Sequence, residues 1–401
     1  PGESDPTAAE AGGRRALLGA EGPSRRCSRF LPRLPSDDLA SALGVAGITA
    51  VGVYPLVGSG ILAGIDNLTF FYPMFSFLGE RLRAGAIPGW NPHQFAGTPF
   101  AADPESGWTS LPAMLFFTAL PLPSAAAALM VFHILVAALS MYAFARIAGI
   151  DPVGSITAAV AFSLSGFFLA QSVCCPAYVF VTAWIPLILL GVHLACRAAA
   201  WRWRVWWWAV AGFALGQVLV MWLGQGTYYI LLLTGAFVAY RTLFAPDDPG
   251  VSPLRRLRGL AIHLAGVLSW AAGFSAAGVL PRVEFVALSN LAKGYVGSAA
   301  TRGGLPAEVA ARVLLNPSQY YAGLSVVAIA VVAPWLARRW SLMPFFLLVL
   351  IASLVLAVGR ATPLHLVAGA VLPRFGEIHS HASERILLLF YPALALPAGA
   401  A

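Results

Sequence analysis

Long apolar stretches, separated by short arginine-bearing segments, dominate the chain. A helix that crosses a bilayer needs about 20 mostly apolar residues. Stretches of about this length recur at residues 40–63, 124–148, 153–172, 177–197, 206–224, 227–245, 259–281, 321–337, 341–359 and 386–401. Only 10% of the 401 residues are charged, against about 25% in a soluble domain. We therefore predict an all-α integral membrane protein with about ten transmembrane helices.

The arginines predict how these helices are oriented. Sixteen of the 25 basic residues fall in the N-terminal tail or in the short loops at 146–152, 197–205, 241–258 and 338–340. Short cytoplasmic loops carry an excess of basic residues, so this pattern places the N-terminus in the cytoplasm. Residues 1–38 are then a basic, disordered cytoplasmic tail, and residues 39–401 are a polytopic transmembrane domain that we expect to be truncated at its C-terminus.

Neither the net charge nor the cysteines indicate a soluble function. The charge of +8 comes from arginine clusters between apolar stretches, with Lys293 as the only lysine, so no nucleic-acid partner is expected. The four cysteines form no disulfide framework or zinc-finger spacing, and the adjacent Cys174 and Cys175 would close only a strained ring. Phosphate-binding loops, nucleophile elbows and His-Glu-x-x-His motifs are missing from the sequence.

Three long outer segments, 64–123, 282–320 and 360–385, are the expected place of any chemistry. Asp66 lies about two residues beyond the end of the first apolar stretch. At that depth a carboxylate is partly desolvated, which raises its pKa and makes it a candidate base, although a solvated loop acid fits the position equally well.

An interfacial helix is predicted directly after Asp66. Apolar residues recur there at helical spacing, and Pro73 suits a first turn. Arg81 and Arg83 suit the last turn, either as phosphate-binding groups or as a solvated helix end. The segment from Gly85 to Pro99 is too rich in glycine and proline for a helix or strand, so we expect a structured loop.

Two further polar clusters are candidate metal sites. Asp103 and Glu105 could hold Mg²⁺ or Mn²⁺, which prefer oxygen ligands. His379 and His381, with a neighbouring glutamate, could hold zinc, or they could be solvated loop histidines.

The order of motifs along the chain resembles one family. The motifs are Trp90-Asn91-Pro92, Gly97-Thr98-Pro99, Ser165-Gly166-Phe167, Trp184-Ile185-Pro186-Leu187 and Glu384-Arg385. Together with the Asp outside the first span, they resemble the YfhO-type bacterial membrane proteins, which are similar to GT-C glycosyltransferases. The resemblance covers most of residues 60–400 and implies a GT-C-like arrangement of helices with helical outer loops.

The resemblance also implies an activity in the bacterial inner membrane. A sugar would pass from a polyprenyl-phosphate lipid to an unidentified acceptor on the outer face, and the position that matches the family's catalytic acid is Asp66. An inverting transfer is expected, because no second nucleophilic carboxylate is identifiable. The substrate-binding candidates are Arg81, Arg83, Trp90, Asn91, His93, Gln94, Asp103, Glu105, Arg282, Arg302, Arg374 and Arg385.

Two other classes of function remain open from the sequence. In a transporter or flippase of lipid-linked substrates, the outer segments would act as gates. A non-catalytic subunit of envelope assembly would show neither transfer nor transport and would co-purify with a partner. A coupled transporter usually carries acids or bases at mid-membrane, and here the spans hold few ionisable groups.

Overall fold

The structure is a computed structural model that describes residues 2, 36–57, 64–289, 313, 320–359, 362–380 and 382–401. The regular elements of this part of the chain are helices, and one isolated antiparallel bridge joins Asn91 to Thr98. The chain divides into two compact units, Pro1–Ala40 and Ser41–Ala401. The helices from α2 onward belong to the second unit. Arg302, His381 and Lys293 lie outside the described residues.

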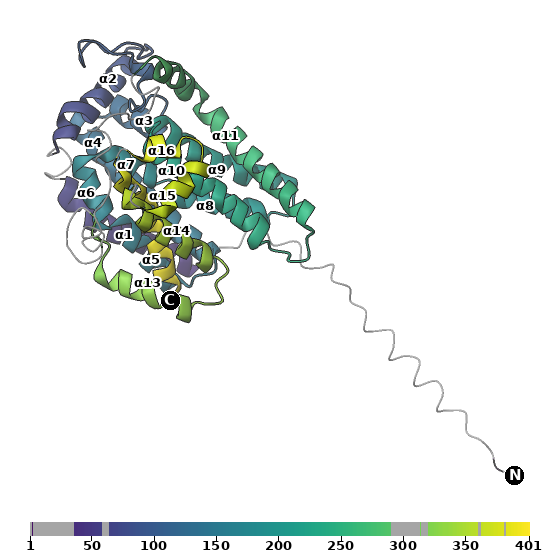
Figure 1. Ribbon diagram of the computed structural model, residues 1–401. Helices are drawn as coiled ribbons and strands as arrows, with labels where there is room; N and C mark the ends of the chain where they lie inside the picture. Colours follow the sequence, from purple (N-terminus) through teal and green to yellow (C-terminus); the bar gives the residue numbers. More distant parts are fainter. Residues whose placement is uncertain are drawn as a thin grey trace. The chain divides into compact units, whose positions relative to one another are not determined.

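Most helices of the described part of the chain follow one another closely, and a longer loop that carries η3 separates α2 from α3 (Figure 1). Their bounds are α1 (Ser36–Pro55), η2 (Asn67–Phe71), α2 (Tyr72–Arg83), η3 (Phe100–Ala102), α3 (Leu111–Ala119), α4 (Leu122–Ile147), α5 (Pro152–Ser163), α6 (Gly166–Cys174), α7 (Pro176–Thr182), α8 (Ile185–Arg197), α9 (Trp201–Met221), α10 (Gln225–Ala239), η4 (Tyr240–Phe244), α11 (Pro253–Leu288), α13 (Leu324–Leu336), α14 (Met343–Ala357), α15 (Pro363–Val371), α16 (Phe375–His379), η7 (Ser383–Leu389) and α17 (Phe390–Ala400).

Seven helices of the described part of the chain are long and apolar enough to cross a membrane. They are Asp38–Pro55, Leu122–Ile147, Pro152–Cys174, Pro176–Arg197, Trp201–Met221, Gln225–Phe244 and Pro253–Leu288. The predicted multi-pass helical architecture is thus confirmed. Predicted spans 321–337 and 341–359 form the shorter apolar helices α13 and α14, and 386–401 forms the end of η7 together with α17.

The arginine-bearing loops meet at one end of the bundle. Arg197 Nη1 donates to the carbonyl oxygen of Ile147 at 3.3 Å. Trp340 Nε1 donates to the carbonyl of Ala148 at 2.9 Å. The hydroxyl of Tyr240 donates to the carbonyl of Ser341 at 2.6 Å. These contacts join the loops that the sequence places on one common side.

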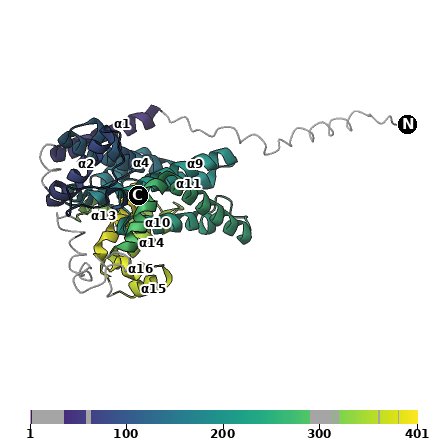
Figure 2. The same cartoon turned by 90° about the horizontal axis from the view of Figure 1, so that it is seen from above.

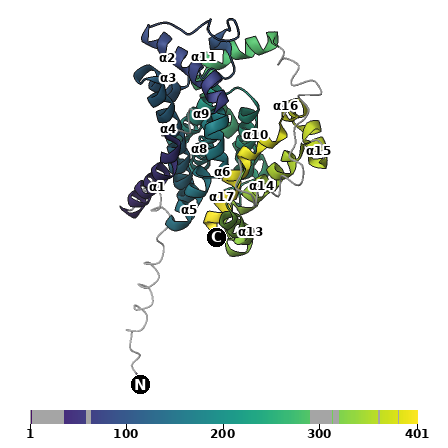
Figure 3. The ribbon, with the colours of Figure 1, turned by 90° about the vertical axis from the view of Figure 1, so that its left-hand side faces the viewer.

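The first outer segment, which carries α2 and α3, lies at the other end of the bundle. Figure 3 shows α2 and α3 at one end of the bundle and α13 at the opposite end. The helix α11 has 36 residues and therefore a length of about 54 Å at 1.5 Å per residue. Because this exceeds a hydrocarbon core of about 30 Å, the last turns of α11 reach the outer segments.

Small residues allow the helices to approach closely. The helices α9 and α11 lie side by side (Figure 2), and α9 also packs on α8. A Cβ atom on Gly212 of α9 would meet Trp270 and Ala271 of α11. Gly154 of α5 and Gly399 of α17 likewise face each other's backbone. Such contacts are typical of helix packing in membranes, where backbone proximity replaces the hydrophobic effect.

The contact between α9 and α11 generates the first prediction. Substituting Gly212→Leu should lower the free energy of unfolding by about 1–3 kcal/mol, because the new side chain has no space against α11. Thermal unfolding in detergent measures the change. The matched control is Gly273→Leu on α11, where a Cβ would have no neighbour within 4 Å. Equal melting temperatures for the two variants would contradict this packing.

Candidate functional site

Asp66 opens the first outer segment and is held near the end of α6. The next residue, Asn67, is buried, and its Nδ2 donates to the carbonyls of Ser172 and Val173, both at 3.0 Å. Asp66 itself is exposed, so the expected partial desolvation of its carboxylate is not observed, and the alternative of a solvated loop acid describes its surroundings. Its Oδ2 lies 3.8 Å from Sγ of Cys175. The amide of Asn67 therefore fixes where the carboxylate of Asp66 emerges from the bundle.

The predicted helix after Asp66 is confirmed as α2. Met74, Phe75 and Leu78 are buried, as their helical spacing predicts. They face the bundle because α2 packs on α3. At the end of α2, Arg83 Nη1 donates to the carbonyl of Phe117 at 2.7 Å and to that of Thr118 at 3.3 Å. Arg83 thus binds the carbonyls at the end of α3, a common role for arginine.

The segment from Gly85 to Pro99 is a structured loop, as we predicted. Polar side chains within it form hydrogen bonds with one another. Asn91 and Thr98 exchange two backbone hydrogen bonds of 2.8 and 2.9 Å. Asn91 Nδ2 donates to Gln94 Oε1 at 3.0 Å, and Asn91 Oδ1 accepts from the backbone N–H of His93 at 3.0 Å. Gln94 Nε2 donates to the carbonyl of Phe70 at 3.2 Å. Trp90 is 59% exposed and covers Gly97.

Asp103 and Glu105 lie in a tight turn after this loop. Asp103 Oδ1 accepts a hydrogen bond from the backbone N–H of Glu105 at 2.8 Å. The backbone N–H of Leu223 donates to the carbonyl of Pro104 at 2.9 Å, which fastens the turn beside the end of α9. Burial raises the pKa of Asp103, whereas the bond from Glu105 and the charge of Arg282 act against this shift.

Arg282 connects this turn to two transmembrane helices. Its side chain lies in α11 and is fully buried. Nη1 donates to the carbonyls of Leu219 and Val220 near the end of α9, at 3.2 and 2.6 Å. Nη2 donates to Ser106 Oγ and to the carbonyl of Trp108, both at 3.2 Å. Arg282 therefore positions the acidic turn through contacts with the protein's own backbone and Ser106.

Arg385 brings the third outer segment to the same place. Its guanidinium lies over the rings of Tyr178 and Trp222, at 5.5 and 6.0 Å from their centroids. Nη1 also donates to Gln225 Oε1 at 3.4 Å. The side chain is half-buried in η7. The guanidinium of Arg385 thus lies over the faces of two aromatic rings, as in a cation–π contact.

The electrostatics of Glu105 show that these groups converge. Burial and the negative charges of Asp103 and Asp66 together raise the pKa of Glu105 to about 7. Arg385 and a side-chain hydrogen bond with Trp222 act in the opposite direction. The pKa of this one carboxylate is therefore influenced by two other acids of its own segment and by an arginine from the far end of the chain. Such a cluster can accept a proton and bind an anionic group.

Other predicted residues have different surroundings. Arg374 Nε forms an exposed ion pair of 2.9 Å with Glu377. His379 is buried, with Nδ1 bonded to the hydroxyl of Tyr229 at 2.6 Å and Nε2 bonded to the carbonyl of Leu356 at 2.9 Å. Both its ring nitrogens are engaged, so the solvated-histidine interpretation is wrong for His379. The His379 side chain is a buried polar group that joins its own helix α16 to α10 and α14.

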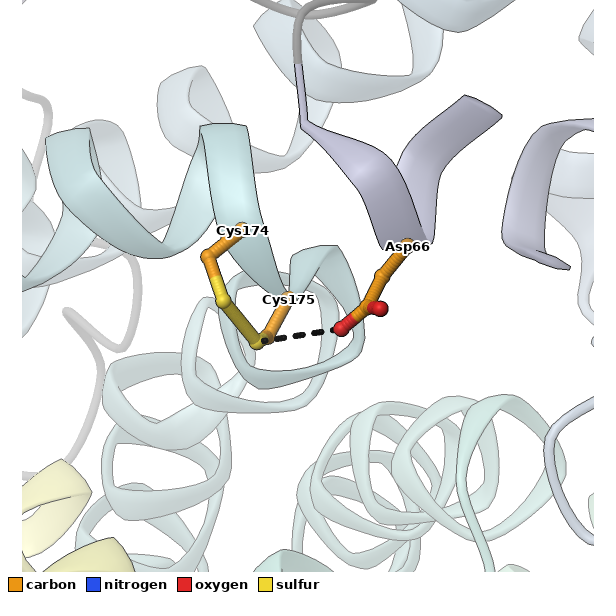
Figure 4. Close-up of side chains that lie close together, drawn as sticks. All are labelled: Asp66, Cys174 and Cys175. Carbon is orange, nitrogen blue, oxygen red and sulfur yellow. Dashed lines mark hydrogen bonds between the residues drawn. A yellow bond between two sulfur atoms is a disulfide. The ribbon is translucent and has the colours of Figure 1, made fainter. Parts of the chain in front are cut away.

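Among the residues that the structure describes, no third His, Cys, Asp or Glu side chain joins Asp103 and Glu105 in a group that could hold one ion. In the described ranges, the group of three His, Cys, Asp or Glu ligand atoms close enough for one ion consists of Asp66, Cys174 and Cys175 (Figure 4). Cys174 and Cys175 form a disulfide, although the sequence alone disfavours closing so small a ring. The cation at Asp103 and Glu105 stays a prediction.

Sequence reasoning missed three residues of this cluster, Tyr178, Trp222 and Gln225. They lie at the ends of predicted apolar stretches, where aromatic residues are expected as membrane-interface anchors. The signal that could have found them was their position: all three occur at the predicted outer ends of spans, next to the segments that carry the acids.

The chain matched no protein-family model, no curated protein and no solved structure in the three comparisons with known proteins.

The geometry of Arg282 generates the second prediction. Arg282→Met keeps a long side chain but removes every donor to the buried carbonyls of Leu219, Val220 and Trp108. Unsatisfied buried acceptors cost about 1–3 kcal/mol each, so we expect unfolding to become easier by about 3–5 kcal/mol. Thermal melting in detergent tests this. The control is Arg374→Met, which removes an exposed ion pair and should cost about 0–1 kcal/mol. Similar melting of both variants would show that Arg282 is not a structural anchor.

Proposed function

We propose that this protein is a membrane glycosyltransferase that moves a sugar from a polyprenyl-phosphate donor to an acceptor at the outer face of a bacterial inner membrane. The observation that carries the proposal is the convergence of Asp66, Asp103 and Glu105 with Arg385. This cluster lies at the end of the bundle away from the arginine-bearing loops. A donor of this kind presents its phosphate at the depth of the lipid headgroups. The transfer needs a base for the acceptor hydroxyl and a positively charged side chain for the leaving phosphate at that depth.

The reaction needs a proton acceptor and a partner for the leaving phosphate. The acceptor hydroxyl gives its proton to the carboxylate of Asp66, while its oxygen bonds to the anomeric carbon of the sugar. The bond from that carbon to the phosphate oxygen breaks, and the phosphate leaves with the bonding electron pair. The proton transfer contributes typically 10²–10⁴-fold to the rate. Asp66 suits this step because its side chain is exposed and open to an incoming hydroxyl.

Arg385 is the arginine that we assign to the phosphate. Arg83 and Arg282 donate to backbone carbonyls, and Arg374 pairs with Glu377. Arg385 rests on two aromatic faces instead, and its hydrogen bond to Gln225 is long at 3.4 Å. Its forked guanidinium matches the oxygens of a phosphate. The aromatic contacts hold the charge in place before the donor arrives, which preorganises it for the leaving group.

The finer architecture belongs to the same proposal. A GT-C-like arrangement with ten spans requires α13, α14 and the segment of η7 and α17 to complete the seven longer helices. The N-terminus would then face the cytoplasm. This orientation places the acids of residues 64–123 and Arg385 on the side where a lipid-linked sugar is used.

Loss of the base gives the third prediction. Asp66→Asn should lower the consumption of a radiolabelled polyprenyl-phosphate sugar by about 10²–10⁴-fold, with purified protein in detergent and an envelope extract as the source of acceptor. The matched control is Glu80→Gln, which removes an exposed acid from the same segment and should leave the rate unchanged. Full activity of Asp66→Asn would remove this residue from the mechanism.

The pKa of Glu105 gives the fourth prediction. As pH rises through about 7, Glu105 gains a negative charge beside Arg385. The apparent KM for the donor should then rise roughly tenfold, equivalent to about 1.4 kcal/mol, because the new negative charge repels the phosphate of the donor. Glu105→Gln should abolish this rise while kcat is retained. A kcat that instead increases through pH 7, and loses this increase in Glu105→Gln, would make Glu105 the base in place of Asp66.

A transporter or flippase of lipid-linked substrates would behave differently in the same assay. An enzyme consumes the donor in detergent, whereas a flippase needs two compartments and leaves the donor intact. A non-catalytic assembly subunit would neither consume nor move the lipid and would co-purify with its partner.

A further inference from the structure

Cys174, Cys175 and Asp66 bring three potential metal ligands together. The two sulfur atoms and one oxygen of the carboxylate all lie within 4.8 Å of one another. Figure 4 shows the Cys175 sulfur directed at the carboxylate of Asp66, with a separation of 3.8 Å to Oδ2. Asp66 is more than 100 positions away from the cysteines, so the fold and not local sequence creates this juxtaposition.

Two local features hold the ligands in place. Pro176 begins α7, and a residue before proline is driven out of the helical region of backbone space. Cys175 accordingly has φ −139° and ψ 74° and separates α6 from α7. Next to Asp66, the buried side-chain amide of Asn67 donates hydrogen bonds to the carbonyls of Ser172 and Val173, the two residues before Cys174. Both sides of the cluster are therefore anchored independently of any ion.

The donor set has the chemistry of a zinc site. Two thiolates and one carboxylate suit a borderline-soft divalent cation, whereas Mg²⁺ and Ca²⁺ prefer oxygen ligands alone. A tetrahedral ion with bonds of about 2.3 Å to sulfur and about 2.0 Å to oxygen needs sulfur and oxygen roughly 3.5 Å apart. The separation of 3.8 Å between Cys175 and Asp66 is close to this value. Three protein ligands leave a fourth position for water or another ligand.

We propose that Cys174, Cys175 and Asp66 bind a thiophilic divalent cation such as Zn²⁺ when the two cysteines are in the dithiol form. The disulfide in the structure is the closed state of this site. An external dithiol opens it: the disulfide takes up two electrons and two protons, and the external dithiol becomes a disulfide. Binding of the cation then releases two protons as the thiols become thiolates. The site shares Asp66 with the proposed function but does not depend on any transferase activity.

The fifth prediction concerns Cd²⁺, a spectroscopic probe for thiolate ligands. Full-length protein in detergent is reduced with a phosphine, freed of metal, and titrated with Cd²⁺. We expect one equivalent to produce a sulfur-to-metal charge-transfer absorption, and Zn²⁺ in large excess to reduce it by competition. Asp66→Asn should weaken the affinity at least about tenfold, since even outer-shell changes cost 10–100-fold. Cys175→Ser should abolish the band, and Cys196→Ser, which alters a cysteine outside the disulfide, should leave it unchanged.

A second measurement on the unsubstituted protein tests the proposal even where a variant does not fold. Zn²⁺ should protect Cys174 and Cys175, and not Cys196, from maleimide in the reduced protein, as read by mass spectrometry. Absence of a one-equivalent band would overturn the proposal. Loss of the band in Cys196→Ser, unchanged affinity in Asp66→Asn, or equal labelling with and without Zn²⁺ would also overturn it.

Discussion

The site depends on one buried arginine. Arg282 has an exposed fraction of 0%, and a charge in that position is tolerated only when hydrogen-bond acceptors surround it. Four acceptors do so: two carbonyls near the end of α9, the carbonyl of Trp108 and the hydroxyl of Ser106. The last carbonyls of a helix have no partners within it and carry partial negative charge. Arg282 supplies the missing donors and so joins α9, α11 and the first outer segment.

The acidic turn takes its position from this anchor. Ser106 follows Glu105 directly, so the bond from Arg282 to Ser106 fixes the backbone that carries the carboxylate. Leu223 holds the same turn through the carbonyl of Pro104. Arg385, which lies in η7, places its guanidinium over the rings of Tyr178 and Trp222. The pKa of Glu105 is raised because the turn is partly buried and two acidic side chains lie near it, and the positive charge of Arg385 acts against this shift.

Local patterns predicted much of this arrangement. Proline in the first turn and apolar residues at helical spacing placed α2 correctly, and the grouping of arginine-bearing loops at one end follows from their alternation along the chain. The hydrogen-bond and aromatic partners of individual arginines could not be predicted from the sequence. Arg83, Arg282 and Arg385 look alike in the sequence, yet one binds the end of α3, one anchors a turn and one lies on aromatic rings. Those differences depend on helix crossings that no local spacing encodes.

The most direct test is a structure of the protein with a bound polyprenyl-phosphate sugar. If Arg385 and Asp66 have the roles proposed for them, the phosphate lies within hydrogen-bonding distance of the guanidinium of Arg385, and the anomeric carbon faces the carboxylates of Asp66 and Glu105. A phosphate bound at the end of the bundle that carries Arg197 and Trp340 would contradict these roles.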